Sequence, residues 1–273
     1  MRRPTTLILA LALAMAIASP AAAATPPGLY VALGDSLAVG DGASDWDVTA
    51  YVPLMADYYA GKMHGDAKDL VNLGVRGETT SSFLGGQLTS AMQAILDPAT
   101  DTRVVTLSLG GNDVGSLLND PGDACVANPF GAECQAEVAA ALTTVSNNFP
   151  AIIFTLQSAL AQDAGDEQLY VLNVYNPFGG TGTPYEGPVD VALLGADLAV
   201  DCTALSNPLN VGLNDIIDCT SRGLGAIPVD GYHAIGDNAL TLTHIGEGTF
   251  DSHPNDEGYA AIAKAHRLAA DSH

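Results

Sequence analysis

Residues 29–40 read LYVALGDSLAVG, and the rest of the chain is interpreted outward from this stretch. Residues 29–33 are an apolar run, typical of a strand that is buried on both faces. Gly34 and Asp35 follow as a tight turn, and Ser36 comes directly after them. Proteins of the α/β class present a nucleophile in this way, at the carboxyl end of a strand. Ser36 is therefore the first candidate for a reactive side chain.

The composition describes an acidic globular protein. Of the 273 residues, 48% are hydrophobic and 15% are charged, which is enough apolar material for one large domain. The formal net charge is −22 at pH 7. A field of that sign repels nucleic acid and anionic membranes, so we expect neither as a partner. We expect a monomer, and the composition leaves open whether the acidity is an adaptation to salt or to acid.

The amino terminus has the pattern of a targeting segment. A basic start precedes an apolar run at residues 7–17, and an A-x-A cleavage pattern ends at Ala24. We predict a secretory signal peptide at residues 1–24 and one exported domain at residues 25–273. A retained membrane anchor is the alternative, but the run is too short to span a bilayer. We see no later stretch of spanning length, so we expect a soluble, secreted protein without a stable anchor.

The four cysteines lie in the predicted mature chain. An even number of cysteines in an exported protein predicts two disulfides. Three connectivities are open, and the local one, which pairs neighbours, closes two short loops. A zinc site is the alternative, but the sequence has no C-x-x-C spacing, so we expect no metal. The cysteines are Cys125, Cys134, Cys202 and Cys219.

Runs typical of strands alternate with runs typical of helices. Proline should break or kink one long helix at Pro150 and interrupt another near Pro208. The alternation without hairpin signals predicts an α/β fold, in which helices cover both faces of a parallel sheet. Strands are expected at residues 29–33, 70–73, 103–109, 169–175 and 226–229, and helices at residues 49–62, 87–96, 134–162, 190–222 and 254–270.

The residues that follow the strands supply the parts needed for acyl transfer. Their side chains meet at one edge of a parallel sheet. A serine hydroxyl needs a base, and His253 is the candidate because imidazole titrates near neutrality. Attack on a carbonyl creates an oxyanion, which needs donors already in position. The backbone N–H groups of Ser36 and Gly77 and the side-chain amide of Asn112 are the candidate donors.

Four blocks of the sequence resemble the SGNH/GDSL hydrolase family. The blocks occur in the family's order and span nearly all of the predicted mature chain. The resemblance implies a flavodoxin-like three-layer α/β/α fold. It also implies an esterase or lipase that cleaves carboxylic esters through an acyl-serine, and we expect it to need no cofactor. The blocks are GDSL at residues 34–37, NLGVRG at residues 72–77, GGND at residues 110–113 and HP at residues 253–254.

The resemblance also implies a role for each matching residue. Ser36 matches the nucleophile, His253 the base, and Gly77 and Asn112 the oxyanion hole. The expected substrate is a small-molecule ester, a lipid or an acylated carbohydrate. The natural substrate and its acyl-chain length stay open at this point.

One position departs from the family pattern. Phe250 stands where the family usually has the aspartate that orients the histidine, and Asp251 lies two residues before His253. Three arrangements are open: Asp251 itself, the Phe250 carbonyl, or an acid from elsewhere in the chain. We choose Asp251, because a carboxylate also stabilises the imidazolium that forms during attack. The competing view is that Asp251 only caps the helix predicted to begin at Pro254.

Three functions other than an esterase are possible alternatives for this sequence. A cofactor-binding flavodoxin-like protein would need a phosphate-cradling loop after the first strand, which the sequence lacks. An inactive binding module on the same fold is favoured only by the missing aspartate at position 250. A carbohydrate deacetylase would use the same residues. Among the other histidines, His244 is the second candidate because it lies close to the last block.

Overall fold

The structure is a computed structural model. It describes residues 28–62, 69–118, 121–162, 167–203, 210–249 and 251–273. The predicted signal peptide at residues 1–24 lies outside the described residues, and so does Phe250.

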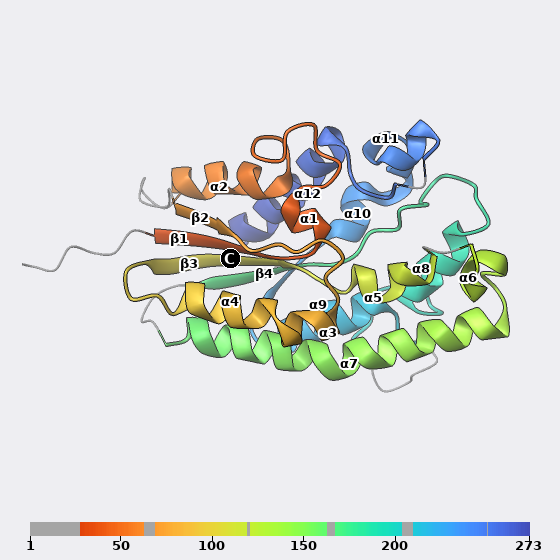
Figure 1. The fold of residues 1–273 in the computed structure, drawn as a ribbon, viewed down its shortest axis with the longest axis horizontal. Coiled ribbons are helices and arrows are strands. Elements are labelled where there is room, and N and C mark those ends of the chain that lie inside the picture. Colours follow the sequence, from red (N-terminus) through yellow and green to blue (C-terminus); the bar gives the residue numbers. More distant parts are fainter. Residues whose placement is uncertain (1–27, 63–68, 119–120, 163–166, 204–209, 250) are drawn as a thin grey trace, which may run out of the picture.

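A sheet of five parallel strands forms the centre of the protein (Figure 1). The strand order is β2-β1-β3-β4-β5. The predicted α/β fold with a parallel sheet is confirmed, and each strand overlaps its predicted position. The strands are β1 (Gly28–Gly34), β2 (Asp69–Asn72), β3 (Asp101–Ser108), β4 (Gln168–Leu172) and β5 (Ile227–Val229).

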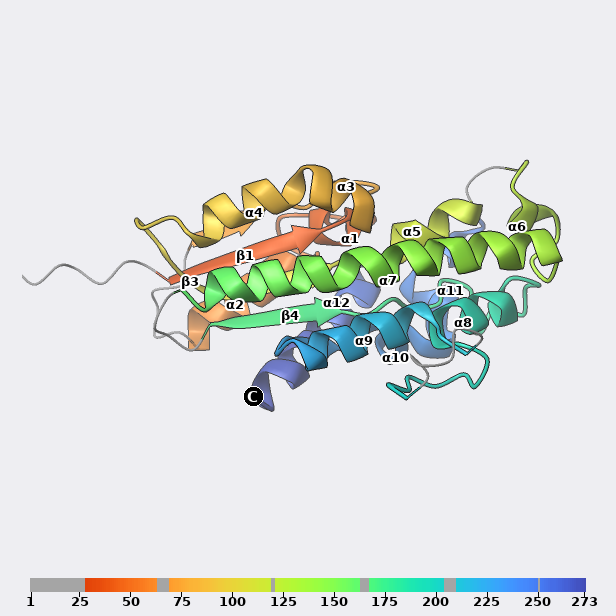
Figure 2. The same cartoon turned by 90° about the horizontal axis from the view of Figure 1, so that it is seen from below.

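Helices cover both faces of this sheet, as predicted. Figure 1 shows the two helical layers, and Figure 2 shows α4, α7 and α9 running along one face. On that face lie α3 (Thr80–Gly85), α4 (Gln87–Ile95), α7 (Ala132–Leu160) and α9 (Leu213–Gly223). On the other lie α2 (Tyr51–Lys62), α10 (Gly231–Ile235) and α12 (Asp256–Asp271). The remaining helices are α1 (Ser36–Val39), α5 (Gly111–Gly115), α6 (Ala124–Ala127), α8 (Glu186–Leu194) and α11 (Ala239–Leu242), with 3₁₀ turns at Ser116–Leu118, Gly236–Asn238 and His244–Glu247.

Strand β1 supplies both halves of the core. Successive side chains of a strand point to opposite faces. Leu29, Val31 and Leu33 pack against the α4, α7 and α9 layer. Tyr30 and Ala32 pack against the α2 and α12 layer. Burial on both faces explains why the strand reads as a continuous apolar run rather than as an alternating one.

Helix α7 runs from Ala132 to Leu160 through Pro150, so of the predicted break or kink, the break does not occur. Proline removes the hydrogen bond to the carbonyl of Ser146, four residues earlier. Ser146 is exposed, so water can take the place of that bond. Phe149 and Ile153, one before and one after the proline, are fully buried in the core and hold the helix against the sheet.

Among the described helices, α7 is also long and apolar enough to cross a membrane by length and composition. From the sequence, no such stretch was expected after residue 17. Here the buried side of α7 packs in the core together with the strands, and Cys134 in its first turn is disulfide-bonded. The buried side chains of α7 therefore help to cover the sheet, although most of its apolar segment is not buried.

Several predicted boundaries need correction. The expected helix at residues 190–222, with its interruption near Pro208, corresponds to two helices, α8 and α9. The described residues between them, 195–203 and 210–212, are not helical, and Pro208 lies outside the described residues. Helix α12 begins at Asp256, because Asn255 caps it by accepting a hydrogen bond from the Gly258 N–H. Pro254 lies before this helix, in a bridge to Thr243, rather than in its first turn.

All four cysteines are paired locally. Cys125 bonds Cys134, which ties α6 to α7, and Cys202 bonds Cys219 of α9. The prediction of two disulfides agrees with this arrangement, and of the three open connectivities the structure has the local one. No thiolate is left to bind zinc.

The strand order identifies the edge where a site is expected. The connection from β1 runs outward to β2, and the chain then crosses back to β3 on the other side of β1. Ligands of such sheets bind at the carboxyl ends of the two strands where the order reverses. In this protein the two strands are β1, which leads to Ser36, and β3, which leads to Asn112.

Candidate active site

The turn after β1 requires glycine before it can present Ser36. Gly34 has φ +123°, and a Cβ on it would stand 2.0 Å from the Ser108 carbonyl oxygen. The close approach lets the Asp35 N–H donate to that carbonyl at 3.0 Å. Ser36 then occupies the first position of α1, with Asp35 as its cap.

Asp35, which precedes the candidate nucleophile, is buried. Its Oδ1 accepts hydrogen bonds from the Leu37 N–H at 3.0 Å and from the Ser108 hydroxyl at 3.1 Å. Burial raises the pKa of Asp35 to about 6, and these hydrogen bonds together with the nearby His253 limit the rise. Asp35 thus organises the turn, which agrees with a structural role for this acid.

His253 contacts both Ser36 and Asp251. Its Nε2 lies 2.8 Å from Ser36 Oγ, and its Nδ1 lies 2.6 Å from Asp251 Oδ1. Asp251 Oδ1 also accepts from the His253 backbone N–H at 3.0 Å. A neutral ring with its proton on Nδ1 satisfies this geometry, since Nε2 is then free to accept from the serine hydroxyl. Among the described residues, which exclude Phe250, the group that contacts Nδ1 is the Asp251 carboxylate.

The carboxylate of Asp251 stays ionised in this setting. Partial burial would raise its pKa, but the hydrogen bonds from the His253 N–H and ring outweigh burial and hold the pKa of Asp251 below its usual value. An ionised carboxylate at Nδ1 stabilises an imidazolium when one forms.

Neighbouring segments hold the loop that carries His253. The Tyr175 hydroxyl, buried after β4, donates to the Ser252 carbonyl at 2.7 Å. The His244 N–H donates to the His253 carbonyl at 3.0 Å, and the His244 ring lies 2.7 Å from the Gly42 carbonyl. His244, the second histidine considered from the sequence, therefore supports the loop instead of contacting Ser36. The supporting role of Tyr175 was not predicted, because a tyrosine at the end of an apolar strand is expected to pack in the core.

The candidate oxyanion donors come from three separate segments. Gly77 is exposed with φ +73°, and apart from its chain neighbours no described atom lies within 4 Å of where its Cβ would stand, so a ligand has room to approach its backbone. Asn112 Nδ2 donates to the Glu78 carbonyl at 3.0 Å, which joins the loop after β2 to the start of α5. A side-chain amide carries two hydrogens, so Asn112 keeps a second donor.

Asp113 strengthens the same junction. Its carboxylate accepts from the Thr80 N–H at 2.9 Å and from the Thr80 hydroxyl at 2.7 Å. Asp113, expected from the sequence to support its own loop, also fixes the start of α3 beside Asn112.

A second exposed group borders Gly77. The Arg76 guanidinium binds the Asp41 carboxylate, with Nε 2.7 Å and 2.8 Å from its two oxygens. The same guanidinium lies 5.4 Å from the centre of the Trp46 ring, and 55% of Trp46 is exposed. Arg76 and Trp46 therefore form part of the surface next to Gly77, at the carboxyl end of the sheet.

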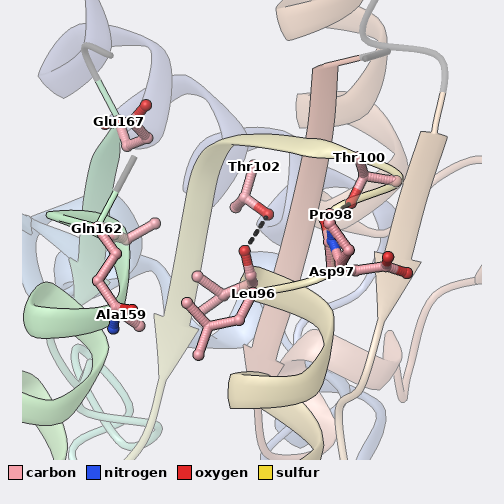
Figure 3. A pocket seen from close by; sticks show the side chains of 10 residues that line it. Leu96, Asp97, Pro98, Thr100, Thr102, Ala159, Gln162 and Glu167 are labelled. Carbon is pink, nitrogen blue, oxygen red and sulfur yellow. Dashed lines mark hydrogen bonds between the residues drawn. The ribbon is translucent and has the colours of Figure 1, made fainter. Parts of the chain in front are cut away.

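A cavity of about 280 Å³ lies at the other end of the sheet (Figure 3). It is lined by the end of α4, the start of β3 and the end of α7, and in it Thr102 donates to the Ile95 carbonyl at 3.4 Å. Because Thr102 stands near the amino end of β3, this cavity is separate from the residues at the carboxyl edge.

Comparisons with known proteins agree with the fold and the four blocks. The model of the GDSL-like Lipase/Acylhydrolase family matches residues 32–261. No curated protein sequence is significantly similar to the chain.

Solved structures with the same fold include lipases and esterases. A lipase from a goat rumen metagenome is 19% identical with TM-score 0.59, and the match covers 88% of this chain and 96% of that one. An extracellular lipase from Streptomyces rimosus is 21% identical with TM-score 0.55, covering 90% and 99%. An acetylxylan esterase from Geobacillus stearothermophilus is 13% identical with TM-score 0.52, covering 90% and 94%.

Proposed function

The chain belongs to the GDSL-like lipase/acylhydrolase family, and from that premise we propose that it is an exported serine hydrolase that cleaves carboxylic esters through an acyl-serine. One observation carries the proposal. His253 lies between the Ser36 hydroxyl and the Asp251 carboxylate, at 2.8 Å and 2.6 Å. A base in hydrogen-bond contact with the nucleophile, itself oriented by an acid, is the arrangement that activates serine.

The proposed reaction has two halves. Ser36 Oγ attacks the ester carbonyl carbon, its proton passes to His253 Nε2, and the carbonyl electron pair moves onto oxygen. The Ser36 and Gly77 N–H groups and the Asn112 amide bind that oxyanion. Its collapse breaks the bond to the alcohol, which leaves with the proton from His253. Water then gives a proton to His253 Nε2 and attacks the acyl carbon. The bond between that carbon and Ser36 Oγ breaks, Oγ takes the proton back from His253, and the acid leaves.

The disulfides support export, and the net charge supports a neutral substrate. The two disulfides suit an oxidising compartment, in keeping with a signal peptide at residues 1–24. The net charge of −22 opposes the approach of anionic substrates, so the proposed substrate is an uncharged ester. An extracellular lipase among the similar structures points the same way.

Removal of acetyl groups from a carbohydrate is a narrower form of the same reaction. The similar fold of an acetylxylan esterase favours it. An acyl-chain-length profile with p-nitrophenyl esters, run beside release of acetate from acetylated xylan, distinguishes the two. A carbohydrate deacetylase would prefer acetate esters and release acetate from xylan, whereas a lipase would prefer longer chains.

The proposed function is tested with p-nitrophenyl acetate and butyrate. We expect hydrolysis by the purified protein, loss of at least about 10³-fold in kcat for Ser36→Ala, and labelling of Ser36 by an alkyl phosphonate. A folded protein that hydrolyses neither ester, or full activity in Ser36→Ala, would exclude the function. Failure of the phosphonate to label Ser36 would exclude the acyl-serine mechanism.

A further inference from the structure

A buried network of side chains connects the three segments that carry the oxyanion donors. Its centre is Glu78, which follows Gly77 and is only 4% exposed. The Glu78 carbonyl accepts the hydrogen bond from Asn112 Nδ2 at 3.0 Å. The backbone of Glu78 therefore holds two of the candidate donors, the Gly77 N–H and the Asn112 amide, near each other.

The carboxylate of Glu78 points inward to Gln87. Gln87 Nε2 donates to Glu78 Oε2 at 2.8 Å, and the Ser82 hydroxyl donates to Glu78 Oε1. Gln87 is the first residue of α4 and is only 6% exposed. A buried carboxylate needs donors of this kind to offset its loss of hydration.

The same Gln87 amide forms two hydrogen bonds with the backbone of Gly34, two residues before Ser36. Gln87 Oε1 accepts from the Gly34 N–H at 2.6 Å, and Gln87 Nε2 donates to the Gly34 carbonyl at 2.8 Å. Both amide hydrogens of Gln87 are therefore used, one on Gly34 and one on Glu78. Gly34 precedes Ser36 by two residues, so Gln87 links the first donor to the other two.

We propose that Gln87 and Glu78 are positioning residues, which set the spacing between the Ser36 N–H and the donors of Gly77 and Asn112. The inference rests on the proposed function, since it assigns these residues to the oxyanion hole of that reaction. A donor lowers the barrier only at about 2.7–3.1 Å from the developing oxyanion. A shift of about 1 Å in such a site can lower the rate about 10²-fold.

The first test truncates each residue in the full chain. We expect Gln87→Ala and Glu78→Ala to lower kcat for p-nitrophenyl butyrate about 10²-fold, with KM changed less than about threefold, because the misplaced donors act only in the transition state. Glu78→Gln should keep kcat within about fivefold, since its amide can still accept from Gln87 and donate to Ser82. The matched control is Gln93→Ala, an exposed glutamine on the same helix.

The rates are divided by the concentration of folded chain, measured by circular dichroism. Unchanged kcat in folded Gln87→Ala and Glu78→Ala overturns the proposal, as does equal loss in Glu78→Ala and Glu78→Gln. If neither truncation folds, Glu78→Asp decides, because it keeps the charge but moves the carboxylate away from Gln87. We expect a lower kcat for Glu78→Asp than for Glu78→Gln, and equal values would overturn the proposal.

Different results exclude the positioning role of Gln87 and Glu78 and the proposed ester hydrolysis. If the native chain hydrolyses no ester, or if Ser36→Ala retains full activity, the function itself is excluded. If hydrolysis depends on Ser36 but not on Gln87 and Glu78, only the positioning role is excluded.

Discussion

At the scale of the residue, the contact between Asp251 and His253 is the one that most affects the proposed chemistry. The family pattern has its aspartate three residues before the histidine, and here the carboxylate two residues before it reaches Nδ1 at 2.6 Å. Asp251 Oδ1 also accepts from the His253 backbone N–H, so the side chain turns back across the loop. This turn lets a carboxylate two residues before the histidine reach the ring.

We predict that Asp251→Asn lowers kcat by about 10²- to 10⁴-fold. An asparagine amide that donates to Nδ1 would favour the tautomer with its proton on Nε2, which cannot accept from Ser36. The measurement is kcat for p-nitrophenyl acetate with the unfolding midpoint recorded in parallel. Glu257→Gln is the control, an exposed acid four residues after His253. Activity within about threefold of native in Asp251→Asn would show that another group orients the ring.

Asp35 should make stability depend on pH. Its pKa is raised to about 6 from an ordinary value of 3.8, so between these values the folded chain holds a proton that the unfolded chain releases. The unfolding free energy therefore falls as pH rises from about 4 to 6 and is level above that range. The fall attributable to Asp35 is about 3 kcal/mol.

Asp35→Asn tests this by removing the titration while keeping the shape of the protonated side chain. Urea unfolding at pH 4 and pH 7 gives the difference in free energy between native and variant at each pH. We expect the variant to gain about 3 kcal/mol relative to native between the two values. A pH-independent difference would mean that Asp35 does not titrate in this range.

At the scale of the element, α7 lacks one backbone hydrogen bond that a substitution of Pro150 can restore. Pro150 leaves the Ser146 carbonyl without its helical donor, on the exposed side of the helix. We predict that Pro150→Ala raises the unfolding free energy by about 1–3 kcal/mol, because alanine restores the N–H and is the best helix former. Urea unfolding measures the change, with Pro98→Ala in an exposed turn as control. An unchanged or lower value for Pro150→Ala would show that the rigidity of proline in the unfolded chain outweighs the lost bond.

The elements show which features could be predicted from the sequence. The apolar run before Gly34 and the β-branched run of β3 carry their signals locally, so both strands and the parallel sheet were predictable. The break expected at Pro150 was wrong, because the free-energy cost of a proline within a helix depends on whether water can reach the Ser146 carbonyl. That access is set by the tertiary structure. The number of disulfides followed from composition, but their pairing required the positions of α6, α7 and α9.

The candidate site divides in the same way. Ser36, Gly77, Asn112 and His253 lie in short blocks that can be recognised without coordinates. The contacts of Gln87 could not be predicted, because its partner Gly34 is 53 residues away. A glutamine at a helix start gives no sequence signal for burial, since glutamine is mostly an exposed residue.

At the scale of the whole molecule, charge dominates. The chain has 31 acidic residues against 9 basic ones. Four ion pairs of Lys and Arg occur within the described residues, and the cations of three are more than half exposed, whereas Arg103 is partly buried. Exposed pairs contribute little to stability, so most of the acidic surface repels itself in the compact state.

We therefore predict that salt stabilises the folded protein at pH 7. Raising NaCl from about 0.01 to 0.3 M shortens the screening length from about 30 Å to well under 10 Å, which weakens repulsion between carboxylates. Thermal unfolding should shift upward by several degrees, with most of the gain below about 0.3 M. The same titration near pH 4.1, the isoelectric point of the sequence, is the control. There the net charge vanishes, so added salt should change the midpoint little. Equal shifts at the two pH values would attribute the effect to salt acting on apolar hydration rather than on charge.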